Sequence, residues 1–122
     1  MSADYTWQLP RDSTAPGQAR WHMRELFAND REAVDAELVV SELVTNAWKH
    51  GQGEGPITLN VQLRDGGVRL EVCGTASGEP RVEIDIDSSS GRGLWLIDGL
   101  ARAWGHERSG ELVCVWAEIA LA

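Results

Sequence analysis

The chain has 122 residues, 43% of them apolar, and a formal net charge of −8. This length suits one domain with its own core, so we expect a single domain over residues 1–122. The acidic balance argues against a nucleic-acid surface, which would carry a basic patch. No apolar run approaches the length of a membrane span and no signal-peptide pattern opens the sequence, so we expect a cytoplasmic protein that does not enter a membrane.

The first half of the chain predicts a strand followed by two helices. Apolar and polar residues alternate along Tyr5–Leu9, which predicts a short strand. Apolar residues recur with helical spacing from Gln18 to Phe27, and a second, strongly apolar helix is predicted over Ala33–Lys49. His50 and Gly51 end that helix, with the glycine at the usual place for a left-handed cap.

The middle of the chain predicts a hairpin and then a long loop. Ile57–Arg64 alternates strictly, as expected of a strand with one face towards water. Asp65-Gly66-Gly67 turns the chain back into a second strand over Val68–Val72. The stretch from Gly74 to Gly93 is polar, and a loop of this length in a compact domain is usually functional or mobile.

The last third predicts a helix over Leu94–Trp104 and a hairpin that joins His106–Ser109 to Leu112–Ile119. One sheet with helices packed against it buries this order of elements economically. The predicted fold class is therefore α+β: a two-layer sandwich in which about three helices cover one face of a mixed, mostly antiparallel sheet.

The aromatic residues and the cysteines give two further expectations about the core. Six tryptophans stand against one phenylalanine and one tyrosine, so indoles are expected to fill much of the core, Trp21 and Trp95 among them. Cys73 and Cys114 both lie in apolar, strand-like segments, and we expect a reduced, buried pair. A disulfide would need an oxidising compartment, and a metal site would need more ligands.

Glu42 and Asn46 interrupt the apolar pattern of the second helix. They are four residues apart, which places both side chains on one side of the helix. A carboxylate and an amide at such positions must be solvated or paired. One interpretation is a helix edge that faces water; the other is a polar site on the helix.

The segment Ser41-Glu42-Leu43-Val44-Thr45-Asn46-Ala47, followed by His50-Gly51, closely resembles the N box of the GHKL (histidine-kinase-like) ATPases. Within that superfamily it is most similar to the small anti-sigma-factor serine/threonine kinases. The resemblance implies the Bergerat fold and a site for ATP and Mg²⁺, with His50 in the nucleotide-binding segment. It also implies that Asn46 is the Mg²⁺ ligand and that Glu42 orients or deprotonates the attacking hydroxyl. Mg²⁺ does prefer hard oxygen ligands, and a carboxylate beside it can accept a proton.

Gly91-Arg92-Gly93-Leu94 opens the third predicted helix and resembles the later Gly-rich box of the same family. Glycines let the backbone approach phosphate groups, and a helix N-terminus offers free N–H groups to an anion. Arg92 adds a charged donor. The resemblance thus implies that all four residues bind the cofactor.

The adenine-binding motif of the family, Asp-x-Gly-x-Gly, is incomplete here. Gly74 stands at the Asp position and Ala76 at the middle glycine, and only the final glycine, Gly78, is kept as a cofactor-binding residue. In the family the Asp accepts a hydrogen bond from the adenine amino group, and glycine has no side chain that could do so. The segment after Gly78, where relatives have a nucleotide lid, is short and acidic, which disfavours a triphosphate.

Two functions remain open. The resemblance implies either a regulator that binds a sigma factor, an anti-anti-sigma-type protein or another transcription regulator while binding nucleotide weakly, or an active ATP-dependent kinase that phosphorylates a serine of such a partner. The catalytic domain of a histidine kinase fits less well, because the chain has no phospho-acceptor helix pair. The resemblance leaves open whether the chain forms a homodimer.

Overall fold

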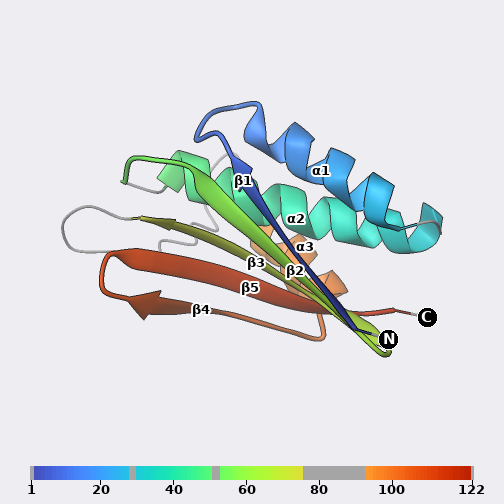
Figure 1. The fold of residues 1–122 in the computed structure, drawn as a ribbon. Helices are drawn as coiled ribbons and strands as arrows, with labels where there is room; N and C mark the ends of the chain where they lie inside the picture. Colours follow the sequence, from blue (N-terminus) through green and yellow to red (C-terminus); the bar gives the residue numbers. More distant parts are fainter. Residues whose placement is uncertain (1, 28–29, 51–52, 76–92, 122) are drawn as a thin grey trace.

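Three helices cover one face of a five-stranded sheet in the computed structural model, which describes residues 2–27, 30–50, 53–75 and 93–121 (Figure 1). The elements in chain order are β1 (Ala3–Leu9), α1 (Ala15–Leu26), α2 (Asp30–His50), β2 (Ile57–Arg64), β3 (Gly67–Thr75), α3 (Gly93–Leu100), β4 (Ala103–Ser109) and β5 (Leu112–Ala120). The predicted α+β class with helices on one face is confirmed. No helix within these residues is long and apolar enough to cross a membrane.

The strand order in the sheet is β1-β2-β3-β5-β4, and every pairing within the described residues is antiparallel. The last hairpin is therefore placed with its second strand, β5, against β3, and its first strand, β4, at the edge. Both hairpins turn at a glycine with positive φ, Gly66 at 78° and Gly110 at 62°. Glycine adopts this backbone conformation without the steric cost that other residues meet.

Aliphatic side chains from the covered face of the sheet and from α2 form the core. Successive strand residues point to opposite faces, so every second residue is buried. The strands contribute Ile57, Leu59, Val61, Val68, Leu70, Val72, Val115, Ala117 and Ile119; α2 contributes Ala36, Val39, Val40, Leu43 and Val44. Full burial of one such Val, Leu or Ile stabilises the fold by about 1.5–3 kcal/mol.

The expectation that indoles fill this core is wrong for the tryptophans whose side chains the structure describes. Trp7, Trp48 and Trp104 are only partly buried at the margin of the core, and Trp21 is 56% exposed on α1. Trp116 lies on the uncovered face of the sheet, beneath the Arg69 guanidinium, whose Cζ is 4.3 Å from the ring centroid. The space between sheet and helices is filled by branched aliphatic side chains instead. The side chain of Trp95 lies outside the described part.

Several helix boundaries differ from the predicted ones; α2, for example, begins at Asp30 rather than Ala33. α1 begins at Ala15 rather than Gln18, because Pro16 fits its first turn and the Thr14 N–H is donated to Asp12 Oδ1 at 2.8 Å. α3 ends at Leu100 rather than Trp104. The Ala101 N–H still bonds back to Ile97, but the Arg102 N–H is donated to Glu118 of β5 at 2.8 Å. Pairing with β5 thus ends the helix.

The expectation of a reduced cysteine pair is contradicted: Cys73 and Cys114 form a disulfide. They lie directly opposite each other in the β3–β5 register, with their Cα atoms 4.1 Å apart. This close spacing is typical of a non-hydrogen-bonded antiparallel pair, in which side chains approach most closely. The bond lies on the uncovered face and joins the two central strands that pack over α2.

We predict that the Cys73→Ser/Cys114→Ser double variant is less stable than the oxidised protein by about 2–4 kcal/mol, because the disulfide closes a long loop in the unfolded chain. The two cysteines are 41 residues apart in sequence. Denaturant unfolding followed by circular dichroism measures the difference, with a chelator present throughout. The reduced wild-type protein serves as the matched control and should unfold with the double variant. Equal stability of the oxidised and reduced proteins would contradict the prediction.

Candidate functional site

α2 positions the predicted polar pair because its apolar side is fixed against the sheet. Glu42 and Asn46 lie beside the buried Leu43 and Val44, and both are half-buried. Neither side chain is hydrogen-bonded to another of the described residues. Both side chains therefore lie at the margin between the core and solvent.

Two polar contacts join α1 to α2. Arg20 Nη1 donates to Ser41 Oγ at 2.8 Å, and Arg24 Nε lies 2.7 Å from Glu37 Oε1. Together they hold the two helices antiparallel, with Ser41 next to Glu42. Arg20, Val34, Glu37, Leu38, Ser41 and Glu42 line a surface depression of about 330 Å³. Asn46 does not line it, so this depression is not the predicted metal position.

Partial burial raises the pKa of Glu42 above its ordinary value, and the positive charge of Lys49 offsets part of that rise. Burial has this effect because it penalises the charged form of a carboxyl group. A carboxylate with raised proton affinity is the kind of group that general-base chemistry requires. The role of Glu42 as a base stays a prediction.

The structure places only part of the remaining predicted set. Gly93 and Leu94 form the first turn of α3, which packs against α2, and their side chains lie outside the description. His50 is the last residue of α2, and its side chain is likewise undescribed. Gly78, Gly91 and Arg92 fall outside the described residues. The structure thus brings the helix carrying Glu42 and Asn46 next to the helix that begins at Gly93, and leaves the contacts of the Gly-rich box undefined.

Arg11 is a residue that the sequence reasoning missed. Its guanidinium donates three hydrogen bonds to main-chain oxygens: Nε to Gly55 at 3.1 Å, Nη1 to Ala47 at 3.3 Å and Nη2 to Thr75 at 3.2 Å. One side chain therefore ties the segment after β1 to the last turns of α2, to the loop before β2 and to the end of β3. An arginine in a polar loop carries no sequence spacing that could have indicated this.

The Arg11 guanidinium faces Gly74, the residue at the Asp position of the family motif. A Cβ added to Gly74 would lie 2.7 Å from Nη2 and 3.6 Å from Cζ. At this position the chain therefore presents hydrogen-bond donors, where relatives present an acceptor for the adenine amino group.

The loop before β2 packs closely against the end of β3. A Cβ on Gly53 would lie 1.6 Å from the Thr75 carbonyl oxygen, so only glycine fits there. The Thr75 hydroxyl donates to the Glu54 carbonyl at 2.6 Å. Arg11 is consequently held by main-chain groups that are themselves fixed.

The described residues suit the Mg²⁺ and phosphate end of an ATP·Mg²⁺ complex better than its adenine end. The Asn46 amide oxygen is a suitable Mg²⁺ ligand, and Glu42 lies one helical turn before it. The first turn of α3 offers backbone N–H groups to phosphate. At the base end the guanidinium of Arg11 and the missing side chain of Gly74 do not suit an adenine amino group, since both that group and the guanidinium are donors.

Comparison with known proteins identifies the family. The family model described as "Histidine kinase-like ATPase domain" matches residues 13–119. The fold is similar to a crystal structure of the RsbU and RsbW domains of Rv1364c from Mycobacterium tuberculosis, with a TM-score of 0.73 and 20% sequence identity over 98% of this chain. The matched region is 32% of that chain, so the present sequence spans about a third of its length. No curated protein matches.

We predict that Glu42→Gln stabilises the protein at neutral pH. A carboxyl group with a raised pKa holds its proton more tightly in the folded than in the unfolded chain. Its ionisation therefore lowers the free energy of unfolding. This cost develops as the pH rises from the ordinary pKa of 4.5 through the raised pKa of the folded chain. Below pH 4.5 the extra stability of Glu42→Gln over the wild type should vanish. Thermal unfolding from acid to neutral pH measures it, with the exposed Glu25→Gln as the control. The same pH dependence in both variants would rule out the assigned cause.

Proposed function

Because this chain belongs to the histidine kinase-like ATPase domain family, we propose that it is an anti-sigma-factor-like regulator in which nucleotide binding is weakened. In this proposal residues 1–122 form one cytoplasmic domain that binds a transcription regulator or its antagonist. The acidic chain, with a net charge of −8, suits a basic protein surface better than nucleic acid. The family and the fold support the regulatory assignment.

The contact between Arg11 and Gly74 is the observation that carries the claim of weakened nucleotide binding. A base-binding site selects adenine by pairing with its amino group, and loss of the acceptor costs both affinity and discrimination. Here the acceptor is replaced by a guanidinium whose Nη2 would lie 2.7 Å from a Cβ on Gly74. Asn46 and α3 remain available for a metal ion and phosphates. Any residual binding should therefore depend on the triphosphate and not on the base.

We predict that ATP·Mg²⁺ binds the isolated protein more weakly than low-micromolar, because a lost hydrogen bond to a charged group costs about ten- to a hundredfold in affinity. GTP·Mg²⁺ and inorganic triphosphate·Mg²⁺ should bind within about threefold of ATP, since no base contact distinguishes them. Isothermal titration calorimetry with the three ligands measures this. Low-micromolar ATP affinity with rejection of GTP would overturn the proposal.

We predict that Gly74→Asp alone gains little adenine-nucleotide affinity, because the new carboxylate would pair with Arg11. Combined with Arg11→Gln, which removes the charge, the same substitution should gain about tenfold over Arg11→Gln alone. Titration of ATP into the wild type and the three variants closes a double-mutant cycle, with circular dichroism as the check on folding. An equal gain with and without Arg11 would show that Arg11 does not block the base position.

An active serine kinase is the second candidate, and the raised pKa of Glu42 is the observation that favours it. In that reading Asn46 binds Mg²⁺, which would neutralise charge on the phosphates. Glu42 accepts the proton of a serine hydroxyl on the partner, while His50, Gly78, Gly91, Arg92, Gly93 and Leu94 bind the nucleotide. Phosphoryl transfer would then depend on positioning and charge stabilisation.

Affinity capture from the native host followed by a phosphotransfer assay separates the two candidates. A kinase would phosphorylate the captured partner, and Glu42→Ala would abolish that activity while partner binding is retained. Asp35→Ala, about two turns earlier on the same helix, is the matched control and should keep activity. Partner binding without any phosphotransfer by the wild type would support the non-catalytic regulator.

A further inference from the structure

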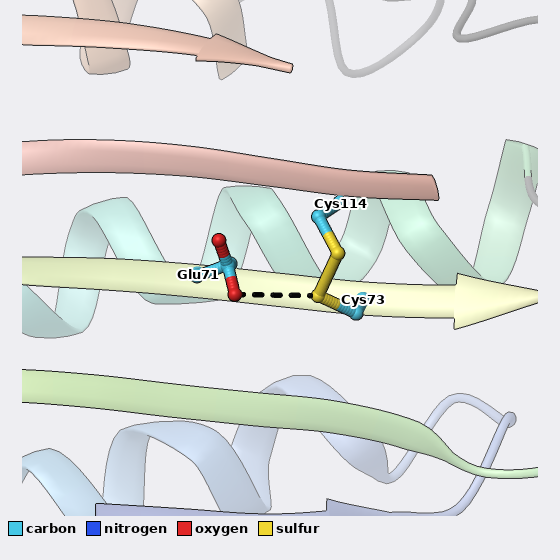
Figure 2. A group of neighbouring side chains, drawn as sticks. All are labelled: Glu71, Cys73 and Cys114. Carbon is cyan, nitrogen blue, oxygen red and sulfur yellow. Dashed lines mark hydrogen bonds between the residues drawn. A yellow bond between two sulfur atoms is a disulfide. The ribbon is translucent and has the colours of Figure 1, made fainter. Parts of the chain in front are cut away.

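A second cluster of metal-ligand side chains lies on the uncovered face of the sheet, away from α2 and α3. Figure 2 shows Glu71 and Cys73 on β3 and Cys114 on β5, all directed to one point. The nearest carboxylate oxygen and the two sulfur atoms lie within 4.8 Å of one another. The antiparallel register sets this arrangement, because Cys73 is opposite Cys114 and Glu71 is two residues before Cys73 on the same face.

The carboxylate of Glu71 approaches the disulfide directly. Its Oε1 lies 3.5 Å from Cys73 Sγ, the contact drawn as a dashed line in Figure 2. A sulfur in a disulfide carries no proton, so in the oxidised protein this is a contact between a carboxylate oxygen and a sulfur and not a hydrogen bond. The contact would become a true hydrogen bond only with a thiol at Cys73.

Neighbouring side chains hold Glu71 in this orientation. Asn60 Nδ2 donates to Glu71 Oε1 at 3.2 Å, and Arg69 Nη2 lies 3.7 Å from Oε2. Arg69 is in turn fixed by Glu118, 3.3 Å from Nη1, and by the ring of Trp116. Outer contacts of this kind orient the ligands of metal sites and support their affinity.

We propose that, once the disulfide is reduced, Cys73, Cys114 and Glu71 bind a thiophilic divalent cation of the Zn²⁺ type. Two thiolates and one carboxylate are ligands that Zn²⁺ accepts in a tetrahedral site, with water as the fourth. Thiolates select it over Mg²⁺ and Ca²⁺, which prefer oxygen. The charges also balance: the cation and Arg69 together offset the three negative ligands. This proposal is independent of the function proposed above.

A dithiol reductant can bring about the change of state. A reductant thiolate attacks one sulfur and releases the other as a thiolate, which leaves a mixed disulfide. The second reductant thiol then displaces the protein sulfur, so the reductant leaves as a cyclic disulfide and the protein has gained two electrons and two protons. Cation binding releases those two protons. A reducing compartment such as the cytoplasm keeps thiols in this state.

Zn²⁺ titration of the full chain tests the proposal. The protein is reduced with a phosphine, freed of it without oxygen, and titrated with Zn²⁺ against a chromophoric chelator. We expect one equivalent to bind the reduced protein and none to bind the oxidised protein. Co²⁺ in place of Zn²⁺ should give a near-ultraviolet thiolate-to-metal band. Equal binding by both forms, or none by the reduced form, would overturn the proposal.

Variants assign the ligands. Cys73→Ser should abolish stoichiometric binding, and Glu71→Gln should weaken it by about tenfold or more while the thiolate band persists. Glu111→Gln, with the same loss of charge in the exposed β4–β5 turn, is the matched control and should bind as the wild type does. Circular dichroism confirms that each variant is folded. Wild-type affinity in Glu71→Gln would refute the three-ligand site.

Discussion

The packing of α2 against the central strands is the contact on which the rest of the structure depends. Val40, Leu43 and Val44 are fully buried against the sheet, so the rotation of the helix about its axis is fixed. Any polar residue on this helix then has a determined position relative to the core. Glu42 is half-buried for this reason, and its raised pKa is a direct result of the packing. The same contact that stabilises the fold thus gives the carboxylate its proton affinity.

Much of the fold could be predicted because it follows from local periodicity. The alternation along Ile57–Arg64 and the spacing in α2 each report which side is buried, and α1, α2, β2, β3 and β5 all lie within a few residues of their predicted places. The end of α3 could not be predicted, since the pattern up to Trp104 is equally apolar. Pairing of Arg102 with Glu118 decides it, and that bond joins residues far apart in sequence.

The same distinction separates the parts of the site that sequence reasoning found from those that it missed. Glu42 and Asn46 could be proposed from the sequence because they share one helix, where spacing determines which side a residue lies on. Arg11 acts on Ala47, Gly55 and Thr75, three segments that only the tertiary structure assembles. The disulfide was missed for a related reason, because it requires the β3–β5 register that sets Cys73 opposite Cys114. Contacts across the sheet or between loops leave no periodic signal in the chain.

Arg11 also changes what the loss of an aspartate at position 74 means. A glycine alone would leave space that water or another side chain could fill, and a nucleotide base could still enter. Instead a guanidinium occupies that position, with its three hydrogen bonds made to main-chain oxygens and not to a carboxylate. These carbonyl groups carry no full charge, and within the described residues Arg11 makes no ion pair. In the proposed function, this arrangement disfavours an amino group beside Gly74, because the amino group and the guanidinium are both donors.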